Sequence, residues 1–261
     1  MILLAGFLAG LLPGLAAPSL PLRIETEGFE ASEADIRAVL ESATATLLPL
    51  VPAHKADPVL VKHGAESPIT LFQRSPRGEI VVALNTGKTY WAQYSYQWSH
   101  ELCHILCGCR DDARDNKWVE ETLCETASLF ALRAMARSWA EHPPYPNWKS
   151  FAPALRRYTD DVAASREKLT RATLPGFVNK HAAELKANPT ARELNGAVAV
   201  VLLEWFEEKP SRWAAVHWLN TTPAQPGLDL DGYFRKWRQD APPEHRATVQ
   251  EFARLLGAKA P

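Results

Sequence analysis

The stretch WAQYSYQWSHELCHILCG, residues 91–108, decides how the centre of this chain folds. Its apolar side chains return every three or four positions, which is the spacing of one face of an α-helix. They are Trp91, Tyr94, Trp98, Leu102 and Ile105. Gly108 follows at the place where a helix commonly ends on glycine. The pattern predicts a helix from about Thr89 to Cys107.

Two histidines lie on this predicted helix, in the sequence HELCH at residues 100–104. Four positions advance a helix by about 400°, so His100 and His104 project from one face, about 40° apart. Two imidazoles so placed can take neighbouring positions on a tetrahedral zinc ion. Glu101 lies about 100° around the helix, where it can reach a zinc-bound water as general base without binding the metal. The motif therefore predicts a zinc site with Glu101 as its catalytic residue.

A catalytic zinc typically has three protein ligands and one open position, so the chain must supply a third ligand. A second helix is predicted from near Asn116 to Glu141, and its first turns carry three glutamates. Glu121 and Glu125 share a face because they are four residues apart. Glu120 is turned about 100° away from them and is expected to be solvated.

HELCH followed by WVEETLCE, residues 118–125, resembles the gluzincin metallopeptidases, which include thermolysin-like and M1-aminopeptidase-like enzymes. In that family the next helix supplies a zinc-binding Glu three residues after a Trp, and matching Trp118 puts this ligand at Glu121. The resemblance implies that Glu125 supports a ligand histidine. It also implies a zincin-like fold, one Zn²⁺ per chain, and a peptide or protein substrate that pairs with an edge strand, either ITLFQ (69–73) or VVALN (81–85).

Gluzincins also place a Tyr or His opposite the zinc, where it stabilises the oxyanion of the reaction. Four side chains downstream of Glu121 are candidates for this role: Tyr145, Tyr158, His181 and His217. The sequence does not choose between them.

Four cysteines, Cys103, Cys107, Cys109 and Cys124, crowd around the motif. Their spacing does not fit a zinc ribbon, and one helical turn between Cys103 and Cys107 is poor geometry for a disulfide. We expect small buried side chains between the two helices, with Cys124 open to one disulfide, and no cysteine bound to the metal.

Three runs rich in β-branched residues precede the two site helices: PVLVKH (58–63), PITLFQR (68–74) and EIVVALN (79–85). Pro, Gly and Ser separate them, as in strands linked by hairpins. A helix beginning near Ser32 comes before them, and the chain after residue 150 has mostly helical patterns. The order predicts an α+β fold: a small antiparallel or mixed sheet at 58–85, site helices at 89–141, and a helical C-terminal lobe at 150–261.

Residues 1–17 resemble a secretory signal peptide, because an apolar run broken by Pro13 and Gly14 ends at Ala16 and Ala17. This pattern predicts a secreted or periplasmic protein whose mature domain covers residues 18–261. No later stretch is apolar enough to span a membrane. A net charge of −1 gives no basic footprint for nucleic acid.

The predicted function is an exported zinc-dependent peptidase. Two alternatives stay open. The first is a non-catalytic zincin-fold domain of the cell envelope that binds a partner, although Glu101 would then have no purpose. The second is a structural domain whose histidines are incidental. Cleavage specificity, endopeptidase or exopeptidase action, and oligomeric state are not determined by the sequence.

Overall fold

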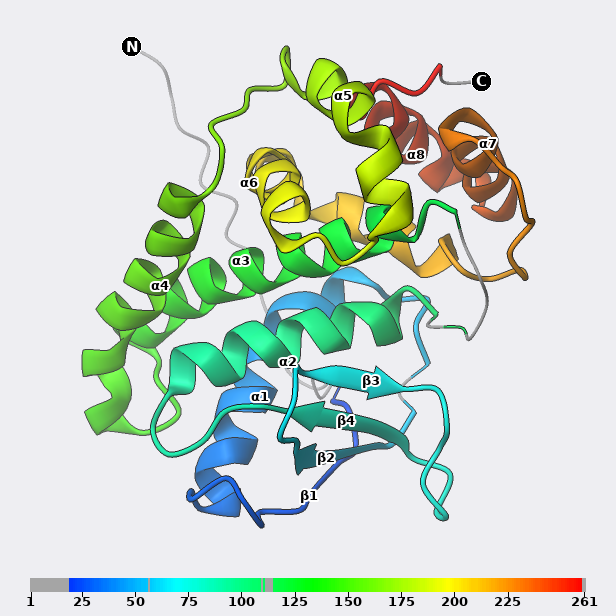
Figure 1. The fold of residues 1–261 in the computed structure, drawn as a ribbon. Coiled ribbons are helices and arrows are strands. Elements are labelled where there is room, and N and C mark those ends of the chain that lie inside the picture. The colour runs from blue at the N-terminus through cyan, green and yellow to red at the C-terminus, as the bar shows by residue number, and fades with distance from the viewer. Residues whose placement is uncertain (1–18, 56, 109, 111–114, 260–261) are drawn as a thin grey trace.

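The computed structural model describes residues 19–55, 57–108, 110 and 115–259 of the 261-residue chain (Figure 1). Its strands are β1 (Leu22–Ile24), β2 (Val59–His63), β3 (Ile69–Leu71) and β4 (Ile80–Leu84). Its helices are α1 (Glu33–Leu47), α2 (Trp91–Leu106), α3 (Lys117–Glu141), α4 (Ala152–Ser165), α5 (Leu174–Ala187), α6 (Arg192–Glu208), α7 (Leu230–Asp240) and α8 (Pro243–Leu255). Three 3₁₀ segments are η1 (Leu48–Leu50), η2 (Pro146–Phe151) and η3 (Pro210–Trp218). The predicted signal peptide and Cys109 lie outside the described residues.

The sheet is mixed and has the strand order β1-β2-β4-β3. β1, β2 and β4 are parallel, with Val61 opposite Val82, and β3 runs antiparallel to β4, with Thr70 opposite Val82. The predicted hairpin between the second and third strand runs is therefore correct. The predicted hairpin between the first and second runs is wrong, because β4 lies between β2 and β3. The uninterrupted apolar runs of β2 and β4 are typical of parallel strands covered on both faces.

α2 and α3 lie side by side, run in opposite directions, and form the middle of the molecule (Figure 1). α2 begins two residues later than predicted and ends at Leu106, where Gly108 has a φ of +76°. This left-handed conformation is one that glycine adopts without steric cost, so the chain can turn away from the helix there. α1 packs on both site helices, and the Trp98 indole N–H donates to Thr44 of α1 at 2.9 Å.

In the C-terminal part, α4 and α6 pack on α3, as Figure 1 shows, whereas α7 and α8 pack on each other and α8 also packs on η3. Sheet, site helices and C-terminal helices share one continuous cluster of buried apolar residues. The sequence did not predict β1, α5 or η3 as separate elements. Among the described residues, no helix has both the length and the apolar character needed to cross a bilayer. The coarse prediction of a small mixed sheet followed by helices is confirmed.

Candidate metal centre

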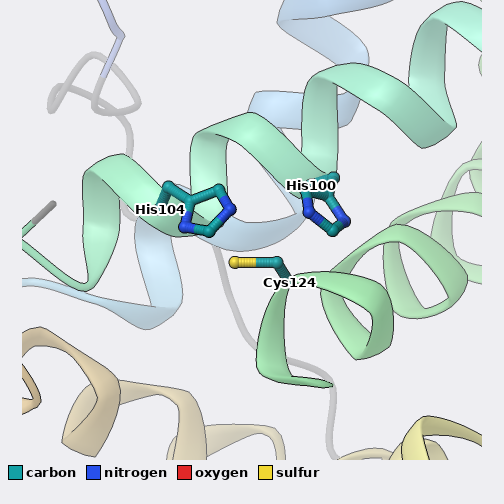
Figure 2. A group of neighbouring side chains, drawn as sticks. All are labelled: His100, His104 and Cys124. Atoms are coloured by element: carbon teal, nitrogen blue, oxygen red, sulfur yellow. The ribbon is translucent and has the colours of Figure 1, made fainter. Parts of the chain in front are cut away.

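α2 presents His100 and His104 to α3 from one face, as Figure 2 shows. The centroids of the two rings are 5.2 Å apart. His104 is the deeper of the two, with 11% of its side chain exposed against 22% for His100. The structure therefore brings together the two histidines that the motif singled out.

Glu121 reaches both histidines from α3. Its Oε2 atom lies 3.5 Å from Nε2 of His100 and 3.7 Å from Nε2 of His104. Neighbouring ligand atoms on a tetrahedral zinc ion with bonds of about 2.0–2.2 Å are roughly 3.4 Å apart. Burial acts to raise the pKa of the Glu121 carboxyl, but its hydrogen bond with His100 and the nearby positive charges bring it below the usual value. His100, His104 and Glu121 thus form a charged donor set of the right size for zinc.

Glu120 is not solvated, contrary to the expectation from helix geometry. Only 4% of the residue is exposed, and its Oε1 atom lies 2.7 Å from Nδ1 of His104. The side-chain amide of Asn220, just beyond η3, donates to Glu120 Oε2 at 2.8 Å. Glu120 is buried because the first turn of α3 is covered by α2 and also by the chain after η3. Glu120 therefore holds the His104 ring in place from behind.

The protonation of His104 follows from this crowding by carboxylates. Burial acts to lower the pKa of its imidazole, but the hydrogen bond with Glu120 and the charges of Glu120, Glu121 and Glu101 raise the pKa to about 10. Without a metal, His104 accordingly carries a proton at neutral pH. A bound divalent cation would replace that proton among the same carboxylates.

Glu101 is 2% exposed and is held by the edge strand β3. The Thr70 hydroxyl lies 2.8 Å from Glu101 Oε2, and also 3.3 Å from the Glu101 carbonyl oxygen. A hydroxyl has one proton to donate, so the shorter contact with the carboxylate is the one that orients it. The position of Glu101 is thus fixed by a residue that the sequence did not point out.

Glu125 makes different contacts from those implied by the resemblance. Its Oε1 atom accepts a hydrogen bond from the Tyr96 hydroxyl and lies 3.8 Å from Nη2 of Arg166. The carboxylate that supports a ring nitrogen of His104 is Glu120. Burial, followed by the charge of Glu125, raises the pKa of Tyr96 well above its usual range, so this phenol stays protonated as the donor.

A cavity of about 380 Å³, here called the metal cavity, opens onto this group of residues. His100, Glu101, Glu121 and Glu125 line it, together with Tyr158. Of the four candidates for oxyanion stabilisation, Tyr158 is the one found in this lining. Burial and the charge of Glu125 raise the pKa of its phenol, which therefore stays neutral at pH 7.

The other three candidates lie elsewhere. Tyr145 packs against Trp148, with ring centroids 4.8 Å apart. His181 packs against Phe177 of its own helix. His217 lines a different cavity, which does not include the ligand residues.

Cys103, Cys107 and Cys124 are buried free thiols, as expected for small side chains between the helices. The Sγ atoms of Cys103 and Cys107 are 3.9 Å apart. Cys124 has another property: its Sγ and one ring nitrogen each from His100 and His104 all lie within 4.8 Å of one another (Figure 2). By distance alone, Cys124 competes with Glu121 as the third ligand.

Two observations favour Glu121 over Cys124. Glu121 lines the metal cavity, where substrate and water can arrive, whereas Cys124 is fully buried and is absent from the cavity lining. Burial also raises the pKa of the Cys124 thiol well above its usual value, so a metal would have to displace a proton from the sulfur, which it need not do at Glu121. The carboxylate of Glu121 is already charged before a metal binds.

Thr70, Glu120 and Asn220 are site residues that the sequence analysis missed. The sequence ITL does not show that Thr70 faces inward, and only the structure shows that the polar residue is the buried one while Ile69 is 48% exposed. A polar side chain that faces inward between two apolar neighbours on a strand indicates a hydrogen-bonding partner in the interior. Asn220 had no signal, since it lies 100 residues from Glu120 in the sequence.

Comparison of the chain with protein families, with curated proteins and with solved structures finds no match.

Proposed function

We propose that this protein is a zinc-dependent peptidase of zincin-like fold, with His100, His104 and Glu121 holding one zinc ion. The observation that carries the proposal is that Glu121 Oε2 lies 3.5 and 3.7 Å from the two histidines, while His100, Glu121 and Glu101 line one cavity. A zinc ion bound there supplies an activated water and polarises the substrate carbonyl.

Glu101 is the acid–base group of the proposal. Because the Thr70 hydroxyl binds Oε2, the other carboxylate oxygen is left to take the proton of the attacking water. Glu101 then returns that proton to the leaving amine. The hydrogen bond from Thr70 holds the carboxylate in one orientation through both transfers.

Tyr158 is the proposed oxyanion-stabilising residue. Its phenol lines the metal cavity and stays neutral at pH 7, so it can donate a hydrogen bond to an oxygen on which negative charge develops. A Tyr158→Phe variant removes the donor and keeps the ring, and it should lower kcat by about 10²- to 10³-fold. Retained zinc in this variant, measured by atomic absorption, shows that the loss is chemical.

The experiment that tests the peptidase proposal is Glu101→Gln, assayed on a broad peptide library. The variant should keep about one zinc per chain, because Glu101 is not a ligand, and lose at least ~10²-fold in activity. Glu204→Gln is the matched control, since Glu204 is an exposed residue on α6. A Glu101→Gln variant that loses its zinc would mean that the metal is held differently.

A second candidate function is a non-catalytic domain with a structural metal site. It is favoured by the position of Cys124 beside both histidines, because His100, His104, Glu121 and Cys124 together would give four protein ligands and a closed site. A protein that binds zinc through the sulfur and cleaves nothing in the library would establish this alternative.

The proposed peptidase is exported, because residues 1–17 resemble a signal peptide. Protein recovered from its native host should then begin near Ala17 or Pro18. An intact Met1 on the recovered protein would remove export from the proposal.

A further inference from the structure

Arg192, the first residue of α6, lines the metal cavity together with Tyr158 of α4. Among the described residues of this lining, Arg192 is the one basic side chain besides the candidate ligand His100. Its guanidinium has no hydrogen-bond or ion-pair partner within the described part of the chain. A positive charge of this kind in a cavity attracts an anionic group of a ligand.

Tyr158 shows that this charge lies close to the proposed chemistry. Burial and the charge of Glu125 raise the pKa of the Tyr158 phenol, and the charge of Arg192 acts in the opposite direction. Charge effects between partly exposed groups fade beyond about 8 to 10 Å, so the guanidinium lies near the phenol. Because Tyr158 is the residue proposed to stabilise the oxyanion, a group held by Arg192 lies near the reacting carbonyl.

The backbone that carries Arg192 is anchored to α3, the helix of Glu121. The buried Asn195 accepts a hydrogen bond from the Thr122 hydroxyl at 3.3 Å and donates one to the Pro189 carbonyl oxygen at 2.7 Å. Thr122 directly follows Glu121 in the chain, so these two bonds tie the start of α6 to the metal centre. The base of the Arg192 side chain therefore has a fixed place relative to Glu121.

The acidic side chains nearest to Arg192 in the chain and in its half of the cavity have other partners. Glu193, the next residue in the chain, pairs with Arg166 at 2.6 Å. Glu125 accepts a hydrogen bond from the Tyr96 hydroxyl and lies 3.8 Å from the same Arg166. Neither carboxylate is therefore needed to balance a second arginine, and the charge of Arg192 stays available to a ligand.

The remaining carboxylates in the described lining belong to Glu101 and Glu121. A bound zinc ion brings two positive charges against these two negative ones. The charge of Arg192 is then left over, and it favours an anion in the cavity. The anionic group of a peptide is a carboxylate, which a guanidinium binds through two parallel N–H···O hydrogen bonds.

We infer that Arg192 determines specificity for a substrate peptide that carries a carboxylate close to the cleaved bond. The inference rests on the proposed peptidase function and adds the substrate class to it. A sphere of 380 Å³ is about 9 Å across and an extended chain rises about 3.3 Å per residue, so the carboxylate lies within about three residues of the cleaved bond. A C-terminus and an acidic side chain both supply this group, and the second test below distinguishes them.

The first test measures binding and needs no turnover. N-acetylglycine carries a carboxylate, and N-acetylglycinamide is the matched neutral probe. Titrated into the ¹⁵N-labelled, zinc-loaded protein, N-acetylglycine should shift the side-chain Nε–H signal of Arg192. N-acetylglycinamide should bind about three- to tenfold more weakly, the range for a bidentate pair that water partly screens. Equal binding of the two probes, or an unchanged Arg192 signal, would overturn the inference.

Variants separate the role of Arg192 from that of the metal, which can itself bind a carboxylate. Arg192→Gln should abolish the preference for N-acetylglycine, followed then through the backbone amides at the start of α6. Arg192 is exposed, so this replacement should leave the fold intact. Arg157→Gln is the matched control, because Arg157 is an exposed arginine next to Tyr158 that does not line the described cavity. A preference that persists in Arg192→Gln would place the carboxylate on the metal alone and refute the contact.

The second test uses peptides that the wild-type enzyme cleaves and neutralises one carboxylate at a time. Amidation of the C-terminus tests the terminal carboxylate, and replacement of an acidic residue near the cleaved bond by its amide tests a side chain. One of the two changes should lower kcat/KM about three- to tenfold in the wild type and cause no further loss in Arg192→Gln. If neither change lowers kcat/KM, the inference is wrong.

The inference and the proposed function fail separately. Binding of N-acetylglycine that requires Arg192, in a protein that cleaves no peptide, keeps the carboxylate site and removes the peptidase. Peptide cleavage that is indifferent to substrate carboxylates and to Arg192→Gln keeps the peptidase and removes the carboxylate specificity.

Discussion

The two sides of the candidate metal centre are built differently. On the interior side, His104 is bonded to Glu120, which is bonded to Asn220, and all three are almost fully buried. On the cavity side, His100 and Glu121 meet at 3.5 Å and line open space. The interior side can fix where a metal lies, whereas the cavity side is where a substrate can meet it. Substitutions on the two sides should therefore fail in different ways.

His104→Ala should have the largest effect. It removes a ligand and leaves Glu120 buried without its partner, so zinc should be lost and the free energy of unfolding should fall by about 3 to 5 kcal/mol. His100→Ala should also lose zinc but cost less stability, because its side chain is twice as exposed. Urea unfolding of the metal-free proteins measures the difference, and equal losses would contradict the two-sided description.

Glu120→Gln should come next. The amide can no longer offer His104 a charged acceptor, and removing a partner of this kind lowers zinc affinity about 10- to 100-fold. Glu125→Gln is the control, because the described contacts of Glu125 are with Tyr96 and Arg166. Competition with a chromogenic chelator measures both affinities. A larger loss in Glu125→Gln would restore the role that the family resemblance implied for Glu125.

Glu120, Glu121 and Glu125 show which features of the site the sequence could predict. The turn per residue put Glu121 and Glu125 on one face and turned Glu120 away, and the first part of that statement was useful, since Glu121 does reach both histidines. Helix geometry does not say what packs against the turned-away face. Here α2 and the chain after η3 cover Glu120, and this contact joins residues 100 positions apart. Local periodicity carries no information about such contacts.

The fold, too, was predicted where it depends on local sequence and was not predicted where it depends on long-range contacts. Helix limits near residue 91 and Gly108 follow from local apolar spacing and from glycine at a helix end, and the sequence predicted them. Strand order was partly wrong, because placing β4 between β2 and β3 depends on pairing over a distance. Thr70 has a meaning only once β3 is known to lie beside Glu101.

The proton on His104 gives a pH prediction for the interior side. A folded-state pKa of about 10, above the unfolded value of 6.5, stabilises the metal-free protein fully below pH 6.5 and progressively less as pH rises towards 10. Zinc must displace this proton, so zinc affinity should rise about tenfold per pH unit from pH 7 to 9, with about one proton released per zinc. Titration calorimetry in buffers of different ionisation enthalpy counts the protons. Zinc binding that releases none would mean that His104 is already neutral.

The smallest effect is expected from Cys124→Ala. This variant tests whether the Cys124 sulfur is a further ligand that closes the metal site. If His100, His104 and Glu121 are the ligands, removing the thiol should change zinc affinity less than about tenfold, the lower range for losing a supporting contact. The wild-type protein loaded with Co²⁺ should then show ligand-field bands without the intense near-ultraviolet absorption of a thiolate bound to cobalt. Cys103→Ala is the matched control, because Cys103 is also a buried free thiol between the two helices but does not belong to the group with the histidines. A thiolate band that Cys124→Ala abolishes and Cys103→Ala keeps would place sulfur on the metal. Four protein ligands would then close the site, and the non-catalytic alternative would replace the peptidase.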